Sequence, residues 1–395
     1  MSGDAFRAEV LRAHGARGAA LDELLAYTPR TLRAPDAPPP FPLPDEPFVG
    51  AWERYAAEGA RAGVWETLRA RLPQLRFPVE AGVSQRDAYR AATRRGEAAF
   101  PAEGLVLRRP EALTLFLHPT PAGRLPVLVA EERDDFVALV RSLSRQSEPS
   151  PIPGSMGAVA VGGFVNWDRV AAHRRAWEAA HPEADGEAWR EEWRRLAGQK
   201  ELYQDRFVLL SRGPYSGVPA AEVGEDDASW DAASLVVRLE HECAHYFSRR
   251  VFGSMLNHAF DELVADYAGI VAAAGRYRAA WARRFFGIET PGRFRPGGRL
   301  GNYRGDPPLS DAAFEVLRSV VDAAVETLEA YDAARAARGW GLAEKAATLS
   351  ALFASSLEEL AAEDGPARLE RRRLETGSNH VSSLSLTDVA PEVTV

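Results

Sequence analysis

The segment from residue 231 to residue 250 constrains the fold more than any other part of the chain. It reads DAASLVVRLEHECAHYFSRR and contains neither proline nor glycine. Its apolar side chains recur at helical intervals, so the sequence predicts one helix that runs through the whole segment. On such a helix His241 and His245 project from neighbouring turns of one face.

Glu242 completes a His-Glu-x-x-His pattern on this helix. Two imidazoles one turn apart can offer two nitrogens to one metal ion at about 2.0–2.1 Å, and a carboxylate beside them can take a proton from metal-bound water. The pattern therefore predicts a site for one zinc ion at His241 and His245, with Glu242 as general base of a hydrolase. Ligation by nitrogen and oxygen would also accept iron, cobalt, nickel or manganese.

A second helix is expected from about Ala259 to Arg283, after turn residues at Gly253 and Asn257. On it Glu262 and Asp266 are four residues apart and share a face. One of these carboxylates could complete the protein ligands of the metal, while the other accepts a hydrogen bond from a ligating imidazole. Three protein ligands would leave a fourth position for water.

The string HECAH, followed after sixteen residues by ELVAD, is similar to the gluzincin metallopeptidases. Its short spacing resembles most the compact gluzincins of the ImmA/IrrE type, and the resemblance covers residues 235–275. It implies zinc ligands at His241, His245 and Glu262, a catalytic base at Glu242, and at Asp266 an acid that supports a ligand through a hydrogen bond. Asp261 could replace Glu262, but only Glu262 stands four residues before Asp266 in the pattern of the family.

The reaction also needs a hydrogen-bond donor opposite the base, where negative charge develops. The sequence offers four candidates, which are His258, Tyr267, Arg299 and Tyr303. Arg299 and Tyr303 lie in a glycine-rich loop that permits unusual backbone paths near a cleft. His258 precedes the second helix, where a capping or surface role is the alternative. Cys243 lies between the two histidines and is interpreted as a small buried residue.

Short β-rich segments separated by proline and glycine lie at about residues 105–130, 158–165 and 205–211. The sequence therefore predicts an α+β fold that is mostly helical, with a small mixed or antiparallel sheet and a zincin-like catalytic region. Residues 207–210 could form an edge strand to which an extended peptide adds, or an ordinary core strand. Other helices are expected at residues 4–26, 48–72, 131–145, 168–198, 310–336 and 342–363.

The chain is expected to divide into three regions. Residues 1–150 would form an N-terminal helical region with a Pro-rich connector at 34–44 and the small sheet. Residues 151–365 would form the zincin-like metallohydrolase region, and residues 366–395 a mobile C-terminal tail.

Composition excludes several classes of protein. The 395 residues carry a formal net charge of −8, which argues against a nucleic-acid partner because phosphate binding needs a surplus of Lys and Arg. A single cysteine cannot form an intramolecular disulfide. The N-terminus lacks the apolar core of a signal peptide, and no segment reaches the roughly 18 apolar residues of a membrane span. We therefore expect a cytoplasmic protein without a membrane partner.

These observations predict a zinc metallopeptidase that cleaves a specific peptide or protein inside the cell. Two alternatives remain open. The first is a metal-dependent enzyme that acts on a small or peptide-derived substrate without being a peptidase. The second is a non-catalytic, protease-like protein that binds or senses a partner.

Overall fold

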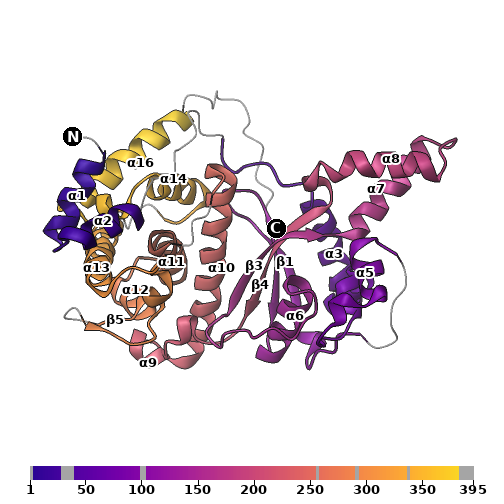
Figure 1. Cartoon of the computed structure of the whole chain (residues 1–395), viewed down its shortest axis with the longest axis horizontal. Helices are drawn as coiled ribbons and strands as arrows, with labels where there is room; N and C mark the ends of the chain where they lie inside the picture. The colour runs from indigo at the N-terminus through magenta and orange to yellow at the C-terminus, as the bar shows by residue number, and fades with distance from the viewer. Residues whose placement is uncertain are drawn as a thin grey trace, which may run out of the picture. The chain divides into compact units, whose positions relative to one another are not determined.

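Helix α10 spans Asp227–Phe252 and is continuous through both histidines, as the sequence predicted (Figure 1). The structure is a computed structural model, and it describes residues 3–27, 40–97, 104–254, 258–289, 293–335 and 339–381.

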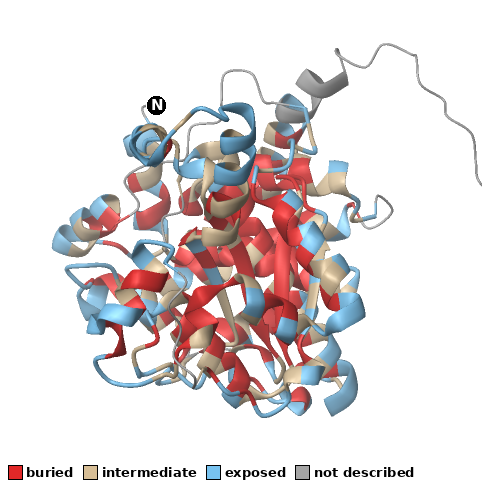
Figure 2. Ribbon diagram, turned by 90° about the vertical axis from the view of Figure 1, so that its right-hand side faces the viewer, coloured by how far each residue is buried: buried red, intermediate tan, exposed pale blue. Residues whose placement is uncertain are grey.

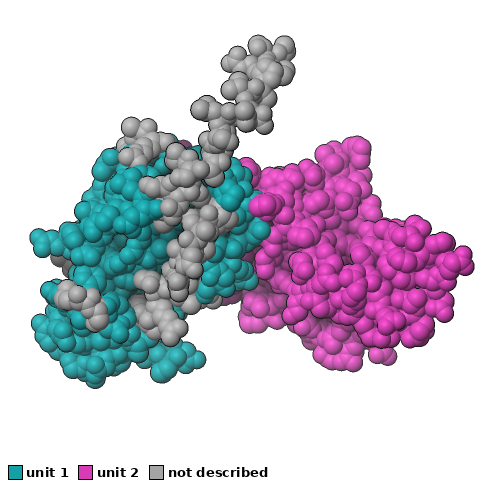
Figure 3. All heavy atoms as spheres, turned by 90° about the horizontal axis from the view of Figure 1, so that it is seen from above, with its two compact units in different colours: residues 1–43, 244–395 teal, residues 44–243 magenta. Residues whose placement is uncertain are grey.

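The chain forms two compact units, residues 44–243 and residues 1–43 with 244–395 (Figure 3). Their boundary lies inside α10, and not at residue 150 where the sequence placed a division. The Pro-rich connector lies largely outside the described residues.

The unit of residues 44–243 contains a mixed sheet of four strands in the order β1-β2-β4-β3. Strand β1 (Thr114–His118) pairs antiparallel with β2 (Leu125–Ala130), which pairs parallel with β4 (Gln204–Ser211). Strand β3 (Ala158–Val165) pairs antiparallel with the other side of β4. The predicted α+β fold with a small mixed sheet is confirmed.

Residues 207–210 lie in β4, the central strand that is paired on both sides. They are four consecutive buried apolar residues, which is typical of a strand covered on both faces. Of the two alternatives, residues 207–210 therefore form the ordinary core strand, and a further peptide strand cannot add to them. Residues 105–109, in contrast, do not form a strand, although Leu105 and Leu107 are buried in the core.

Helices α3 and α6 pack against this sheet. Trp52 of α3, Phe136 of α6 and Phe207 of β4 belong to one buried core. The predicted helix at 168–198 is two helices, because Pro182 follows the end of α7 and Asp185 caps α8 by accepting hydrogen bonds from two backbone amides. The helices of this unit before α10 are α3 (Val49–Ala62), α4 (Val64–Arg71), α5 (Asp87–Arg94), α6 (Arg133–Ser144), α7 (Trp167–Ala180), α8 (Gly186–Ala197) and α9 (Ala220–Val223).

The other unit is mainly helical. Its helix α11 (Ala259–Ala274) is buried at Ala259 and from Asp261 to Val271. Buried residues are red in Figure 2. The second predicted helix ends at Ala274 because Gly275 adopts a left-handed conformation with φ of +71°. Helices α12 (Ala279–Phe286), α13 (Asp311–Ala333) and α14 (Leu342–Phe353) pack against α11. This unit also contains α1 (Gly3–Ala13), α2 (Gly18–Tyr27), β5 (Ile288–Glu289), β6 (Arg293–Phe294), α15 (Leu357–Ala361) and α16 (Gly365–Val381).

Helix α16 occupies residues that the sequence assigned to a mobile tail. Residues 382–395 of that predicted tail lie outside the described residues. Among the described helices, none is both long and apolar enough to cross a membrane.

Candidate metal centre

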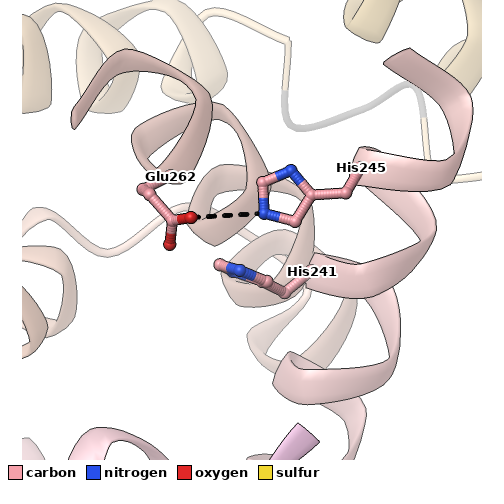
Figure 4. Close-up of side chains that lie close together, drawn as sticks. All are labelled: His241, His245 and Glu262. Atoms are coloured by element: carbon pink, nitrogen blue, oxygen red, sulfur yellow. Dashed lines mark ion pairs between the residues drawn. The ribbon is translucent and has the colours of Figure 1, made fainter. Parts of the chain in front are cut away.

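Two consecutive turns of α10 present His241 and His245 on one face (Figure 4). Both side chains are buried, with 8% and 5% of their surface exposed. Burial of two imidazoles side by side costs free energy unless their nitrogens find partners. The helix therefore brings together two strong metal ligands at a site shielded from solvent.

Glu262 supplies the third side chain from the first turn of α11. It is also buried, and its carboxylate points toward the two imidazoles (Figure 4). One ligand atom from each of His241, His245 and Glu262 lies within 4.8 Å of the others. Asp261 is buried next to Glu262 in the sequence. Of these two carboxylates, the group of potential ligands contains Glu262, the one that the sequence predicted.

The spacing of His245 and Glu262 suits two ligands of one metal ion. The distance from His245 Nε2 to Glu262 Oε1 is 3.5 Å. A charge-assisted hydrogen bond between nitrogen and carboxylate oxygen would be about 2.7–2.9 Å long. Two ligands about 2.0–2.1 Å from a tetrahedral ion lie about 3.4 Å apart, which is one edge of the tetrahedron. The three residues could therefore hold one metal ion.

Tyr215 contacts the outer nitrogen of His241. Its hydroxyl lies 3.0 Å from His241 Nδ1, and both side chains are buried. A hydrogen bond at Nδ1 leaves Nε2 as the nitrogen that can bind a metal, because an imidazole has only two. Tyr215 was not predicted from the sequence, because it lies 26 residues before its partner in a segment without a recognisable pattern.

The loop of Tyr215 is fixed to α10 at three points. The Tyr215 amide donates to Ser234 Oγ at 2.9 Å. Arg238 donates to the carbonyls of Gly213 and Pro214 at 2.7 and 2.9 Å, and its guanidinium lies 5.9 Å from the centre of the Tyr215 ring. Burial lowers the pKa of Arg238 to about 10, so it remains a cation at neutral pH. These contacts hold the phenol against the ligand.

Asp266 lies one turn after Glu262 on α11 and is fully buried. Its carboxylate accepts a hydrogen bond from Arg299, whose guanidinium also lies 5.2 Å from the ring centre of Phe286. The structure thus brings Arg299 into the same region as the ligand helix. The predicted hydrogen bond from a ligating imidazole to Asp266 stays a prediction.

Tyr303 lies close to Glu262 as well. Burial raises the pKa of its phenol well above the usual range, Arg299 opposes this rise, and a hydrogen bond with the Glu262 carboxylate adds to it. The phenol is therefore protonated at neutral pH and can act as a donor. The Tyr303 carbonyl accepts a hydrogen bond of 2.5 Å from the hydroxyl of Tyr27, which in turn accepts one of 3.2 Å from the Ala259 amide.

The remaining predicted residues occupy different surroundings. Glu242 is partly exposed on α10, between the two histidines. His258 directly precedes α11, and its ring packs edge-on against Tyr27 at 5.1 Å, one helical turn before Glu262. Its role as a donor stays a prediction. Cys243 is 4% exposed, which confirms its interpretation as a small buried residue.

Comparison with known proteins places the chain in a family but not in a functional class. Residues 9–364 match the model of a family described as "Family of unknown function (DUF7005)", so the chain belongs to that family. The comparisons with curated proteins and with solved structures gave no match.

Proposed function

We propose that this protein is a zinc-dependent hydrolase, and specifically a metallopeptidase that cleaves a particular peptide or protein. The observation that carries the proposal is the group of three buried side chains that could hold a metal ion. The distance of 3.5 Å between His245 Nε2 and Glu262 Oε1 is close to the spacing of about 3.4 Å expected for two ligands of a tetrahedral ion. Glu242 adjoins the ligands on the same helix. The resemblance of the ligand pattern to gluzincins supports a peptide or amide bond as the substrate.

The number of protein ligands favours catalysis over a structural role. Structural zinc sites almost always have four protein ligands, whereas catalytic sites have three and keep one position for water or substrate. Among the described residues, two imidazoles and one carboxylate form such a set of three. When bound, zinc would lower the pKa of water to about 7 and polarise the carbonyl group of the substrate.

The residues around the ligands would supply proton transfer and orientation. Glu242 would accept a proton from water and later donate it to the leaving amine. Tyr303, whose phenol is protonated, would donate a hydrogen bond to the substrate oxygen that gains negative charge. Arg299 would hold Asp266, and through it the ligand helix, in position.

Substitution Glu242→Gln tests this proposal. The variant should bind as much zinc as the wild type and lose at least about 100-fold in hydrolysis, which is typical for loss of a general base. Activity would be followed by mass spectrometry of new chain ends in a pool of synthetic peptides. Glu240→Gln is the matched control, because Glu240 is on the same helix and contacts His118 at 3.1 Å. A Glu242→Gln protein with bound zinc and full activity would refute the mechanism.

A further inference from the structure

Strand β3 forms an edge of the four-stranded sheet, and its sequence AVAVGGFV contains no charge and no proline. Natural proteins usually protect such edges with charged residues, proline or a bulge, because unpaired backbone groups attract another strand. In β3 the only such device is a bulge at Gly163, whose φ is +68°. The first half of the strand, Ala158–Gly162, keeps a regular register.

The register shows which backbone groups face the open edge. Residues 157 and 211 form a hydrogen-bonded pair, because the Ser211 amide donates to the Gly157 carbonyl at 2.9 Å. Since such pairs alternate in an antiparallel ladder, Val159 and Val161 bond to β4. The amides and carbonyls of the alternate residues, Ala158, Ala160 and Gly162, therefore point away from β4. Among the described strands, none pairs with this side of β3.

A groove of about 530 Å³ runs beside this edge. One wall is formed by residues 159–165 of β3, and the other by α5 and the C-terminal end of α6. Ala160 and Gly162 are exposed along the β3 wall, and because alanine carries only a methyl group and glycine no side chain, they leave room for a second backbone. The groove shares no residue with the candidate metal centre.

The side chain of Gln74 ends inside this groove. It is 7% exposed, and its Nε2 lies 3.5 Å from the carbonyl of Val165, which shows that this edge already accepts one hydrogen bond from outside the sheet. Its Oε1 is buried and has no hydrogen-bond partner within the described part of the chain. A buried acceptor without a partner costs free energy, and a bound backbone amide would supply the partner.

Two arginines give the groove its charge. Arg94 on α5 and Arg145 after α6 both line it and are exposed. None of the described residues that line the groove is acidic. Cationic side chains beside an open edge favour a strand that carries carboxylates on the side facing them.

We propose that the β3 edge and its groove bind an extended, acidic peptide segment of a partner protein. The peptide adds to the sheet as a fifth strand through the backbone of Ala158, Ala160 and Gly162. Every second side chain of the peptide faces the groove, where Arg94 and Arg145 bind glutamate or aspartate. This site is separate from the proposed hydrolytic centre.

Fluorescence anisotropy with labelled synthetic peptides tests the proposal. The probe is a nine-residue peptide that alternates Val and Glu, and its counterpart has Lys in place of Glu. The acidic peptide should bind at least tenfold more tightly, and the double variant Arg94→Glu/Arg145→Glu should reverse this preference. Binding should persist after treatment with a chelator, which separates this site from peptide binding at the metal centre.

Backbone pairing is tested by two further changes. Ala160→Pro removes an amide that faces away from β4, so the variant should keep its thermal midpoint and lose peptide affinity at least tenfold. Two further peptides carry N-methyl groups on one or the other set of alternate residues. They should bind the wild type with different affinities, because only one set of peptide amides faces β3. Equal binding of the two methylated peptides, or no binding of the acidic peptide at millimolar concentration, would overturn the proposal. A wild-type dimer that Ala160→Pro dissociates would assign the edge to a second copy and overturn it as well.

Discussion

Tyr215→Phe removes one hydroxyl from the outer side of a metal ligand and leaves the ring in place. The hydroxyl lies 3.0 Å from Nδ1 of His241. Outer partners of this kind fix the orientation of the imidazole and raise its affinity for the metal, and their loss typically costs 10–100-fold in metal affinity. We expect a loss of that size, which corresponds to about 1.4–2.7 kcal/mol of binding free energy.

The same substitution should affect the metal-free protein less. It removes one buried hydrogen bond, whose net contribution to stability is about 0.5–1.5 kcal/mol. The ring keeps its contact with Arg238, and the Ser234 hydroxyl still accepts from the backbone amide. Unfolding in urea, measured after metal removal, should show this small decrease.

Competition with a chromophoric chelator measures the zinc affinity of both proteins. Tyr277→Phe is the matched control, because Tyr277 is also buried and its hydroxyl has no hydrogen-bond partner in the part of the chain that the structure describes. The control should bind zinc as the wild type does. If Tyr215→Phe and Tyr277→Phe both retain wild-type affinity, Tyr215 does not support the ligand and our reading of its contact is wrong.

Two further substitutions test the scaffold. Asp205→Ala should lower the free energy of unfolding by about 3–5 kcal/mol. Asp205 is fully buried, and its loss leaves Arg169 and the Trp52 indole without the carboxylate that both contact. Urea titration would measure this decrease, and a change below about 1 kcal/mol would contradict the prediction. Gly298→Ala should destabilise the loop of the candidate donors by about 1–3 kcal/mol, since the added Cβ would lie 2.8 Å from the Phe286 carbonyl oxygen. An unchanged thermal midpoint for Gly298→Ala would show that the backbone yields freely there.

Helical periodicity predicted where the helices lie but not where they end. The segment at 48–72 has one continuous pattern, and yet the helix stops at Gly63, whose φ is +92°. The run at 105–109 has the composition of a strand, but it buries Leu105 and Leu107 outside the sheet. Local propensity is overridden in such places by tertiary packing, which a single sequence does not reveal.

The candidate metal centre was more predictable than the fold around it. Its ligands lie within 22 residues on two helices, and the period of the helix alone aligns His241 with His245 and Glu262 with Asp266. Tyr215 could not be found in this way, because a loop delivers it and no spacing rule links it to α10. Pairing of β4 on both sides also depends on long-range contacts.

Metal content is the measurement that tests the central claim most directly. Purified protein would be analysed by mass spectrometry for bound metals beside Glu262→Ala, and beside Asp261→Ala as the neighbouring control. We predict about one equivalent of zinc in the wild type and in Asp261→Ala, and its loss in Glu262→Ala, because Glu262 belongs to the group of three ligands. Absence of metal from the wild type, or equal zinc in all three proteins, would contradict the assignment of His241, His245 and Glu262 as a metal centre.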